Sequence, residues 1–173
     1  MSALFALLLI GCDSGTSTPA ANRMSVSQVA DPGLPALTGR VVDGAALLDE
    51  ATRARLSAQS ADLERATGSQ FVTVTVPSLG ERSIEEFGLA LGQYWKVGRA
   101  EHDDGVLLIV APKERRVRIE VGRGLERVIS NPKAQAIIDD IILPEFRGDR
   151  MQQGIVAGAD AIVATLAAKE RGS

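Results

Sequence analysis

The stretch EHDDGVLLIVAPKERRVRIEVGRGLE, residues 101–126, decides the fold of this chain. Residues 105–111 form an almost wholly apolar run, and residues 116–121 alternate charged and apolar side chains. Both patterns predict β-strands, and Pro112-Lys113-Glu114 between them predicts a turn. Strands joined this closely must pair antiparallel, because a parallel return needs a dozen or more residues. The two strand ends far from the turn are therefore expected to meet.

This hairpin gathers acidic residues at its open end. If Ala111 pairs with Arg115, Asp104 lies opposite Gly122, although a slip of one residue would turn every side chain to the other face. Crowded carboxylates repel one another and suit a hard divalent cation such as Ca2+ or Mg2+, which prefers oxygen ligands. The alternative is a solvated acidic turn whose glycines only shape the chain. The predicted metal ligands of the hairpin are Asp103, Asp104, Glu120 and Glu126.

The beginning of the chain predicts a lipid anchor. Residues 3–10 are apolar, too short to span a bilayer as a helix, and placed like the core of a signal peptide. The string Leu9-Ile10-Gly11-Cys12 resembles a bacterial lipobox, which implies cleavage before Cys12 and acylation of its thiol. Cys12 is the only cysteine, so it cannot form an intramolecular disulfide. We expect a signal peptide at residues 1–11 and a lipoprotein anchored in the membrane of a bacterial cell envelope, on its extracytoplasmic side.

Composition separates a tether from one domain. Residues 13–37 are rich in Ser, Thr, Pro, Ala and Gly without sustained periodicity, so residues 12–37 are predicted to be a flexible, lipidated tether. Residues 38–173 have the length of one domain with its own core. The net charge of −3 and the absence of a basic tract argue against nucleic acid as a partner.

Helical and strand patterns alternate through the domain. A helix is predicted from an N-cap at Asp49 to about Ala66, and a strand over residues 70–76. Ser83-Ile84-Glu85-Glu86 is a capping box that begins a second helix. Strand, helix and the strand at 105–111 form a βαβ unit, which places those two strands parallel. The second helix carries one apolar stripe, formed by Ile84, Phe87, Leu91 and Trp95.

Two further helices follow the hairpin. Asn131 and Pro132 are predicted as N-cap and first residue of a helix that Pro144 closes, and residues 149–169 form the last helix. The expected architecture is an α/β fold, a Rossmann-like three-layer α/β/α sandwich with a mixed sheet.

Several strings in one order resemble the TPM domain family. They run from about Gly39 to Gly154: VVDGAALL, TGSQFVTVTVPSLG, SIEEFGLALGQYWKVG, HDDGVLLIVA, RRVRIEVGRGLE and LPEFRGDRMQQGI. The resemblance implies an α/β/α fold, divalent-metal binding and membrane-tethered or lumenal placement. Acid phosphatase activity has been assigned to some members, and roles in envelope or photosystem maintenance to others. The family usually has Asp-Asn-Gly where this chain has Asp103-Asp104-Gly105. Asp43 belongs to the metal pocket by resemblance alone, because the predicted topology places it near the opposite strand ends.

The residue inventory narrows the phosphatase chemistry. No cysteine lies in the domain, which excludes a cysteinyl-phosphate intermediate, and His102, the sole histidine, lacks the Arg-His-Gly context of histidine phosphatases. Metal-assisted hydrolysis remains, with Asp103 and Asp104 as the predicted catalytic carboxylates. Arg118 or Arg123 is the candidate phosphate ligand. The competing expectation is a non-catalytic, metal-stabilised binding module that docks on a membrane protein and serves its assembly or maintenance.

Overall fold

The structure is a computed structural model that describes residues 33–170. The predicted signal peptide, Cys12 and the tether up to residue 32 lie outside the described residues. At the start of the described part, Leu34 packs against the core beneath the second helix, and the Pro35 carbonyl accepts a 2.8 Å hydrogen bond from the Trp95 indole N–H. Contacts with the domain therefore begin before Thr38.

Four strands form one mixed sheet in the order β1-β2-β3-β4. They are β1 (Val41–Asp43), β2 (Gln70–Thr75), β3 (Gly105–Ala111) and β4 (Arg116–Val121). The first three are parallel neighbours, and β4 runs antiparallel to β3, as predicted. All seven residues of β3 are buried, which explains its unbroken apolar sequence, because a strand covered on both faces has no solvent side.

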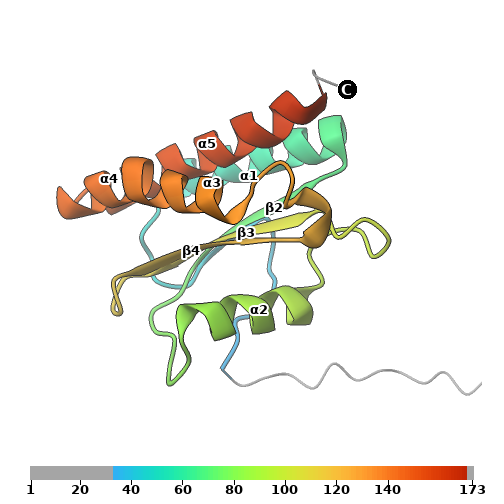
Figure 1. Cartoon of the computed structure of the whole chain (residues 1–173). Helices are drawn as coiled ribbons and strands as arrows, with labels where there is room; N and C mark the ends of the chain where they lie inside the picture. Colours follow the sequence, from blue (N-terminus) through green and yellow to red (C-terminus); the bar gives the residue numbers. More distant parts are fainter. Residues whose placement is uncertain (1–32, 171–173) are drawn as a thin grey trace, which may run out of the picture.

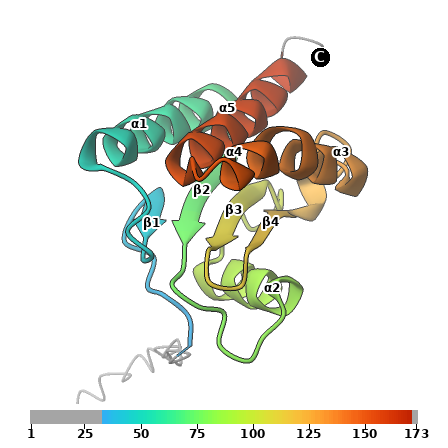
Figure 2. The same ribbon diagram turned by 90° about the vertical axis from the view of Figure 1, so that its left-hand side faces the viewer.

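Helices cover both faces of this sheet (Figure 1). One face carries α2 (Ile84–Trp95), and the other carries α1 (Glu50–Thr67), α3 (Asn131–Ala136), α4 (Leu143–Arg147) and α5 (Met151–Glu170). Figure 2, seen along the strands, separates these three layers clearly. The predicted α/β/α sandwich is confirmed.

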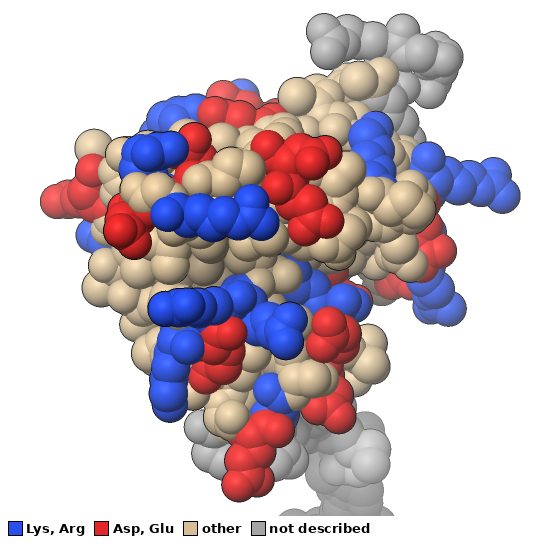
Figure 3. All heavy atoms as spheres, turned by 60° about the vertical axis from the view of Figure 1, so that its left-hand side comes forward, with Lys and Arg blue, Asp and Glu red and all other residues tan. Residues whose placement is uncertain are grey.

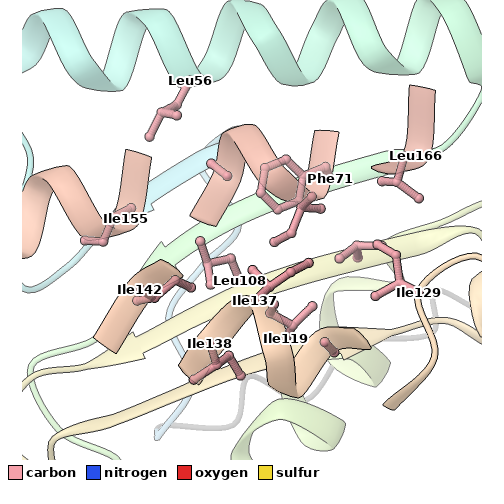
Figure 4. Packing of buried hydrophobic residues seen from close by; sticks show 14 of the residues in the cluster. Leu56, Phe71, Leu108, Ile119, Ile129, Ile137, Ile138, Ile142, Ile155 and Leu166 are labelled. Carbon is pink, nitrogen blue, oxygen red and sulfur yellow. The ribbon is translucent and has the colours of Figure 1, made fainter. Parts of the chain in front are cut away.

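Each pair of layers encloses an apolar core. The larger core lies between the sheet and the four-helix layer, where Phe71 and Leu108 from the strands meet Leu56, Ile142 and Ile155 from the helices (Figure 4). The smaller core lies under α2 and contains the whole predicted stripe of Ile84, Phe87, Leu91 and Trp95. By length and composition, Met151–Ala168 of α5 is apolar enough to cross a membrane, but this helix supplies Ile155, Ile162 and Leu166 to the larger core.

The predicted helix ends are confirmed at α1 and α2. The Asp49 side chain accepts a 2.7 Å hydrogen bond from the Thr52 amide, and Gly68 ends α1 in the left-handed conformation with φ 75°. Ser83 and Glu86 form both hydrogen bonds of the capping box. These caps satisfy backbone groups that have no partner inside the helix.

The hairpin register differs from the prediction by one residue. The turn takes four residues, Pro112 to Arg115, because Arg115 adopts a left-handed φ of 53° before β4 begins. Ala111 therefore pairs with Arg116 and not with Arg115. The shift places Ile119 in the larger core and Glu120 opposite Leu107, on the α2 side of the sheet.

Pro144 does not close the helix that precedes it, contrary to the prediction. The helix begins after an N-cap at Ser130, one residue earlier than predicted, and continues through a π-helical segment, Ile137–Ile142, into α4. In that segment the Leu143 amide donates to the Ile138 carbonyl, five residues back. The wider turn lets the chain pass Pro144, which has no amide to donate, without a break.

Candidate functional site

A cleft of about 670 Å3 opens where β3 begins and β4 ends. Its other walls are the C-terminal half of α2 and the loop over residues 96–103, which lies at the right of Figure 1. The charged residues that line it are Lys96, Arg99, Asp103, Glu120, Arg123 and Glu126. Side chains of both signs therefore share one hollow at the open end of the hairpin.

Two glycines let the strand ends approach backbone to backbone. A Cβ atom on Gly122 would lie 2.1 Å from the Asp103 carbonyl oxygen, and one on Gly124 would lie 1.8 Å from that of His102. The Gly122 amide donates to the Gly105 carbonyl at 2.8 Å, and the Gly124 amide donates to the Asp103 carbonyl at 3.1 Å. The convergence of the two strand ends, expected from the hairpin, is thus present.

Asp103 is held loosely at the mouth of the cleft. Its Oδ2 accepts a 2.8 Å hydrogen bond from Arg123 Nε, and the two side chains are 48% and 86% exposed. Ion pairs this open to water contribute little to stability because both charges stay solvated. Asp103 and Arg123 can therefore separate at small cost and bind other groups.

Asp104, the next residue, has a different environment. Its side chain is only 6% exposed, and it accepts hydrogen bonds from the backbone amide of Arg99 at 2.7 Å and from the Arg99 guanidinium. Burial raises the pKa of Asp104, but the hydrogen bonds and charge of Arg99 outweigh it and leave the pKa below its usual value. Asp104 does not line the cleft, so its charge serves to hold the loop at Arg99.

Glu120 and Glu126 complete the acidic lining. Glu120 Oε2 accepts a 2.6 Å hydrogen bond from Arg118 Nε, and Arg118 lies against Gly88 of α2. A neighbouring hollow of about 350 Å3 contains Arg118 and shares Glu120 and Glu126 with the cleft. Glu126 is exposed and makes no ion pair with any described residue, so its carboxylate is open to a ligand.

The structure does not bring Asp43 to this cleft. Asp43 pairs with Thr75 at the far end of β2, and its carboxylate accepts hydrogen bonds from the Leu47 and Leu48 amides at 3.0 Å. Those contacts organise the turn after β1. His102 is exposed and not among the residues that line the cleft.

Among the described residues, no three His, Cys, Asp or Glu side chains are grouped as a ready metal site. Each of Asp103, Asp104 and Glu120 is instead ion-paired with an arginine. The donor atoms nevertheless have the chemistry of a hard-cation site: carboxylate oxygens beside glycine-rich backbone. A Ca2+ or Mg2+ ion would need Asp103 to exchange Arg123 for the ion, which their exposure permits.

Sequence reasoning missed the residues that fix the loop over the cleft. Arg99 binds Asp104, and the Gln70 side chain accepts a 2.8 Å hydrogen bond from the Gly98 amide while donating to Glu64 at 3.0 Å. A glutamine at the start of a buried strand was the available signal, because such a side chain must find partners. Nothing in the spacing of Arg99 and Asp104 distinguished a buried pair from two solvated charges.

The structure thus belongs to the class of α/β/α sandwich domains, with a charged cleft at the open end of its β-hairpin. The chain belongs to the TPM domain family, whose model matches residues 41–165. The N-terminal domain of a protein from P. gingivalis is 31% identical, with a TM-score of 0.71 over 82% of this chain and 87% of that one. No curated protein matches the chain.

Two solved structures of lower identity share the fold. The N-terminal domain of cg2496 from Corynebacterium glutamicum is 13% identical, with a TM-score of 0.58 over 74% of this chain and 80% of that one. BA42 from Bizionia argentinensis is 19% identical, with a TM-score of 0.60 over 70% of this chain and 82% of that one.

Proposed function

We propose that this chain is a membrane-anchored TPM-domain lipoprotein whose cleft binds a hard divalent cation and a phosphomonoester and hydrolyses the ester. The observation that carries the proposal is the mixed lining of the cleft. Asp103, Glu120 and Glu126 offer oxygen ligands, while Lys96 and Arg123 offer donors to phosphate. A phosphate ester with its counter-cation needs both kinds of group in one place.

The chain's own residues divide the work of binding. Asp103, released from its exposed pair with Arg123, is the first ligand for Ca2+ or Mg2+, with Glu120 and Glu126 beside it. Arg123, once free of Asp103, can hold two phosphate oxygens through its planar guanidinium. A bound cation would polarise a phosphoryl oxygen and lower the pKa of a water molecule. Asp104 stays with Arg99 and keeps the loop over the cleft in place.

The second candidate is a non-catalytic binding module that docks on a membrane protein and serves its assembly or maintenance. This module is metal-stabilised and needs no preorganised catalytic centre, which agrees with one observation: no three metal-ligating side chains are grouped among the described residues. In that case the cleft would bind its cation or anion without turnover. Both candidates use the same residues, so only activity distinguishes them.

The decisive experiment measures cation affinity and phosphomonoester hydrolysis on one preparation. Calorimetric titration with Ca2+ and Mg2+ and p-nitrophenyl phosphate turnover are compared for the wild type, Asp103→Asn and a control, Asp140→Asn, whose carboxylate is exposed on the π-helical segment and outside the cleft. We expect cation-dependent turnover, with affinity reduced at least about tenfold in Asp103→Asn only.

Cation binding without turnover would select the binding module. Turnover that needs no cation and survives Asp103→Asn would contradict the proposed cleft chemistry.

The proposed lipid anchor is tested separately, because it rests on the lipobox-like string. Wild-type protein should partition with membranes, and Cys12→Ser should appear in the soluble fraction or remain unprocessed. Membrane partition and lipid labelling unchanged by Cys12→Ser would exclude acylation at that thiol.

A further inference from the structure

A second hollow, of about 490 Å3, lies at the other end of the hairpin. Arg115 and Arg116 from the hairpin and Arg147 from the end of α4 line it, together with the apolar side chains of Leu143, Phe146 and Met151. We call these six residues the turn-end hollow. The function proposed for the cleft uses none of them.

The side chains of the three arginines in the turn-end hollow make no hydrogen bond or ion pair with any residue that the structure describes. Asp149, a carboxylate, also lines the hollow. Figure 3 turns the left-hand side of Figure 1 toward the viewer, where the hairpin turn and α4 lie. Lys and Arg side chains lie across the middle of this face and also in its upper part, interspersed with acidic side chains.

The backbone conformation of Arg115 is a further feature of this hollow. It adopts φ 53°, a left-handed conformation that glycine and asparagine tolerate and that costs a longer side chain roughly 1–2 kcal/mol. Turn geometry alone would thus favour Gly or Asn here. Ala46, Lys96, Asp103 and Asp149 also have a positive φ, so this conformation supports a role for the Arg115 side chain only together with its place among the arginines of the hollow.

We propose that the turn-end hollow docks the domain on a bilayer that contains anionic phospholipid. Phosphate oxygens of the headgroups would accept hydrogen bonds from the arginines, which bind phosphate through two parallel donors. The half-buried Leu143, Phe146 and Met151 give the same hollow an apolar wall for the less polar part of the lipid. An anionic surface strengthens binding about fivefold for each basic side chain close to it.

A lipid tether would make this modest attraction sufficient to dock the domain on the membrane. The residues between Cys12 and Gly33 span at most about 70 Å when extended, so an acylated chain keeps the domain at a high effective concentration near the surface. This step rests on the proposed acylation of Cys12, whereas the attraction itself does not. The hairpin places the turn-end hollow and the cleft at opposite ends of β3 and β4 (Figure 1). Docking by the turn would leave the cleft facing water.

Vesicle sedimentation of a non-acylated protein tests the proposal without the anchor. The chain from residue 12 with Cys12→Ser lacks the apolar residues 3–10, which would bind any bilayer, and retains every described helix and strand. Binding is measured to phosphatidylcholine vesicles with and without phosphatidylglycerol. The variant Arg115→Asn/Arg147→Gln is compared with a charge-matched control, Arg127→Gln/Lys133→Gln, whose side chains are exposed, unpaired with described residues and outside the hollow.

We expect binding only to vesicles that contain phosphatidylglycerol, and weaker binding at higher salt. The hollow variant should bind about 25-fold more weakly, and the control should change less than about twofold. Equal losses in both variants, or equal binding to neutral vesicles, would overturn the proposal. Abolition of vesicle binding by millimolar inorganic phosphate at constant ionic strength would also overturn it, since the hollow would then be a small-anion site.

Discussion

The two ends of the β3–β4 hairpin use the same residue types in opposite ways. At the open end the backbones touch through Gly122 and Gly124, and arginines are paired with Asp103, Asp104 and Glu120. At the turn end the arginines have no acidic partner among the described residues and surround a hollow with apolar walls. The role of an arginine in this protein therefore cannot be read from its residue type alone. Whether it stabilises the fold or remains open to a ligand depends on the carboxylates that the topology brings beside it.

Substitutions at the two ends are therefore expected to have different effects on stability and on binding. At the open end the backbone is closely packed at Gly122 and Gly124 and Asp104 forms a buried ion pair, so changes at these residues should lower the free energy of unfolding. At the turn end Arg115, Arg116 and Arg147 are exposed and make no ion pair with a described residue, so changes to these side chains should alter binding more than stability.

Gly124→Ala should be the most damaging of these substitutions. Its new methyl group would lie 1.8 Å from the His102 carbonyl oxygen, so the backbone must shift and the hydrogen bond from Gly124 to Asp103 must weaken. We expect a loss of about 3 kcal/mol in the free energy of unfolding and a fall of about 10 °C in Tm.

The matched control for that substitution is Gly39→Ala. A Cβ on Gly39 meets no atom within 4 Å, and this glycine does not need a left-handed φ. Urea titration of both variants measures the free energy of unfolding, and the effect of Gly39→Ala should stay within about 0.5 kcal/mol. Similar losses for both glycines would mean that the close approach at the open end is not what requires Gly124.

The fold could be predicted from the sequence because its signals are local and repeated. The apolar run of β3, the capping box at Ser83 and the N-cap at Asp49 each have one structural solution. The one-residue register error came from the turn, where Arg115 takes a conformation for which its sequence gives no signal. The error at Pro144 arose because a π-helical segment can absorb a proline that would otherwise end the helix.

The candidate site could be predicted only in part. Hairpin topology was enough to bring Asp103 near Glu120 and Glu126, since antiparallel strands have no other way to end. It could not distinguish Asp103 from Asp104, because exposure and partners depend on where Arg99 lies. Adjacent residues of one type thus have different roles. The grouping of Arg115 and Arg116 with Arg147 could not be predicted either, because Arg147 comes from α4, far along the chain.

Asp104 should have the second-largest effect. Asp104→Ala removes a buried acceptor of hydrogen bonds from the Arg99 backbone and guanidinium, which we expect to cost about 2 kcal/mol of stability. Asp104→Asn keeps an acceptor for the Arg99 amide and should cost about half as much. Chemical denaturation of both variants measures this order, and both variants would instead gain stability if Asp104 only repelled neighbouring carboxylates.

Acid titration of stability isolates the charge of Asp104. Because its pKa is lowered in the folded protein, its ionised form stabilises the fold fully above the unfolded value of about 3.9. That contribution is lost as the pH falls through the folded pKa. The stability difference between wild type and Asp104→Asn should therefore be constant from about pH 8 to 5 and shrink below about pH 4. If the stability advantage of the wild type over Asp104→Asn grew as the pH fell, the ionised form of Asp104 would destabilise the folded protein.

The smallest change in stability should come from Arg115→Asn, and it should have the opposite sign. Asparagine tolerates the left-handed φ of 53° better than arginine, and Arg115 has no ion pair with a described residue to lose. We expect the free energy of unfolding to rise by about 0.5 kcal/mol, measured as a higher urea midpoint with an unchanged slope. Arg116→Asn is the control, because Arg116 is the first residue of β4, outside the left-handed region, and its substitution should not raise the stability.

A substitution of Arg115 that stabilises the protein while weakening its attachment to anionic vesicles would show that this arginine is retained for binding. If Arg115→Asn instead destabilises the hairpin and leaves vesicle binding intact, the turn end is a structural element like the open end, and the contrast between them fails.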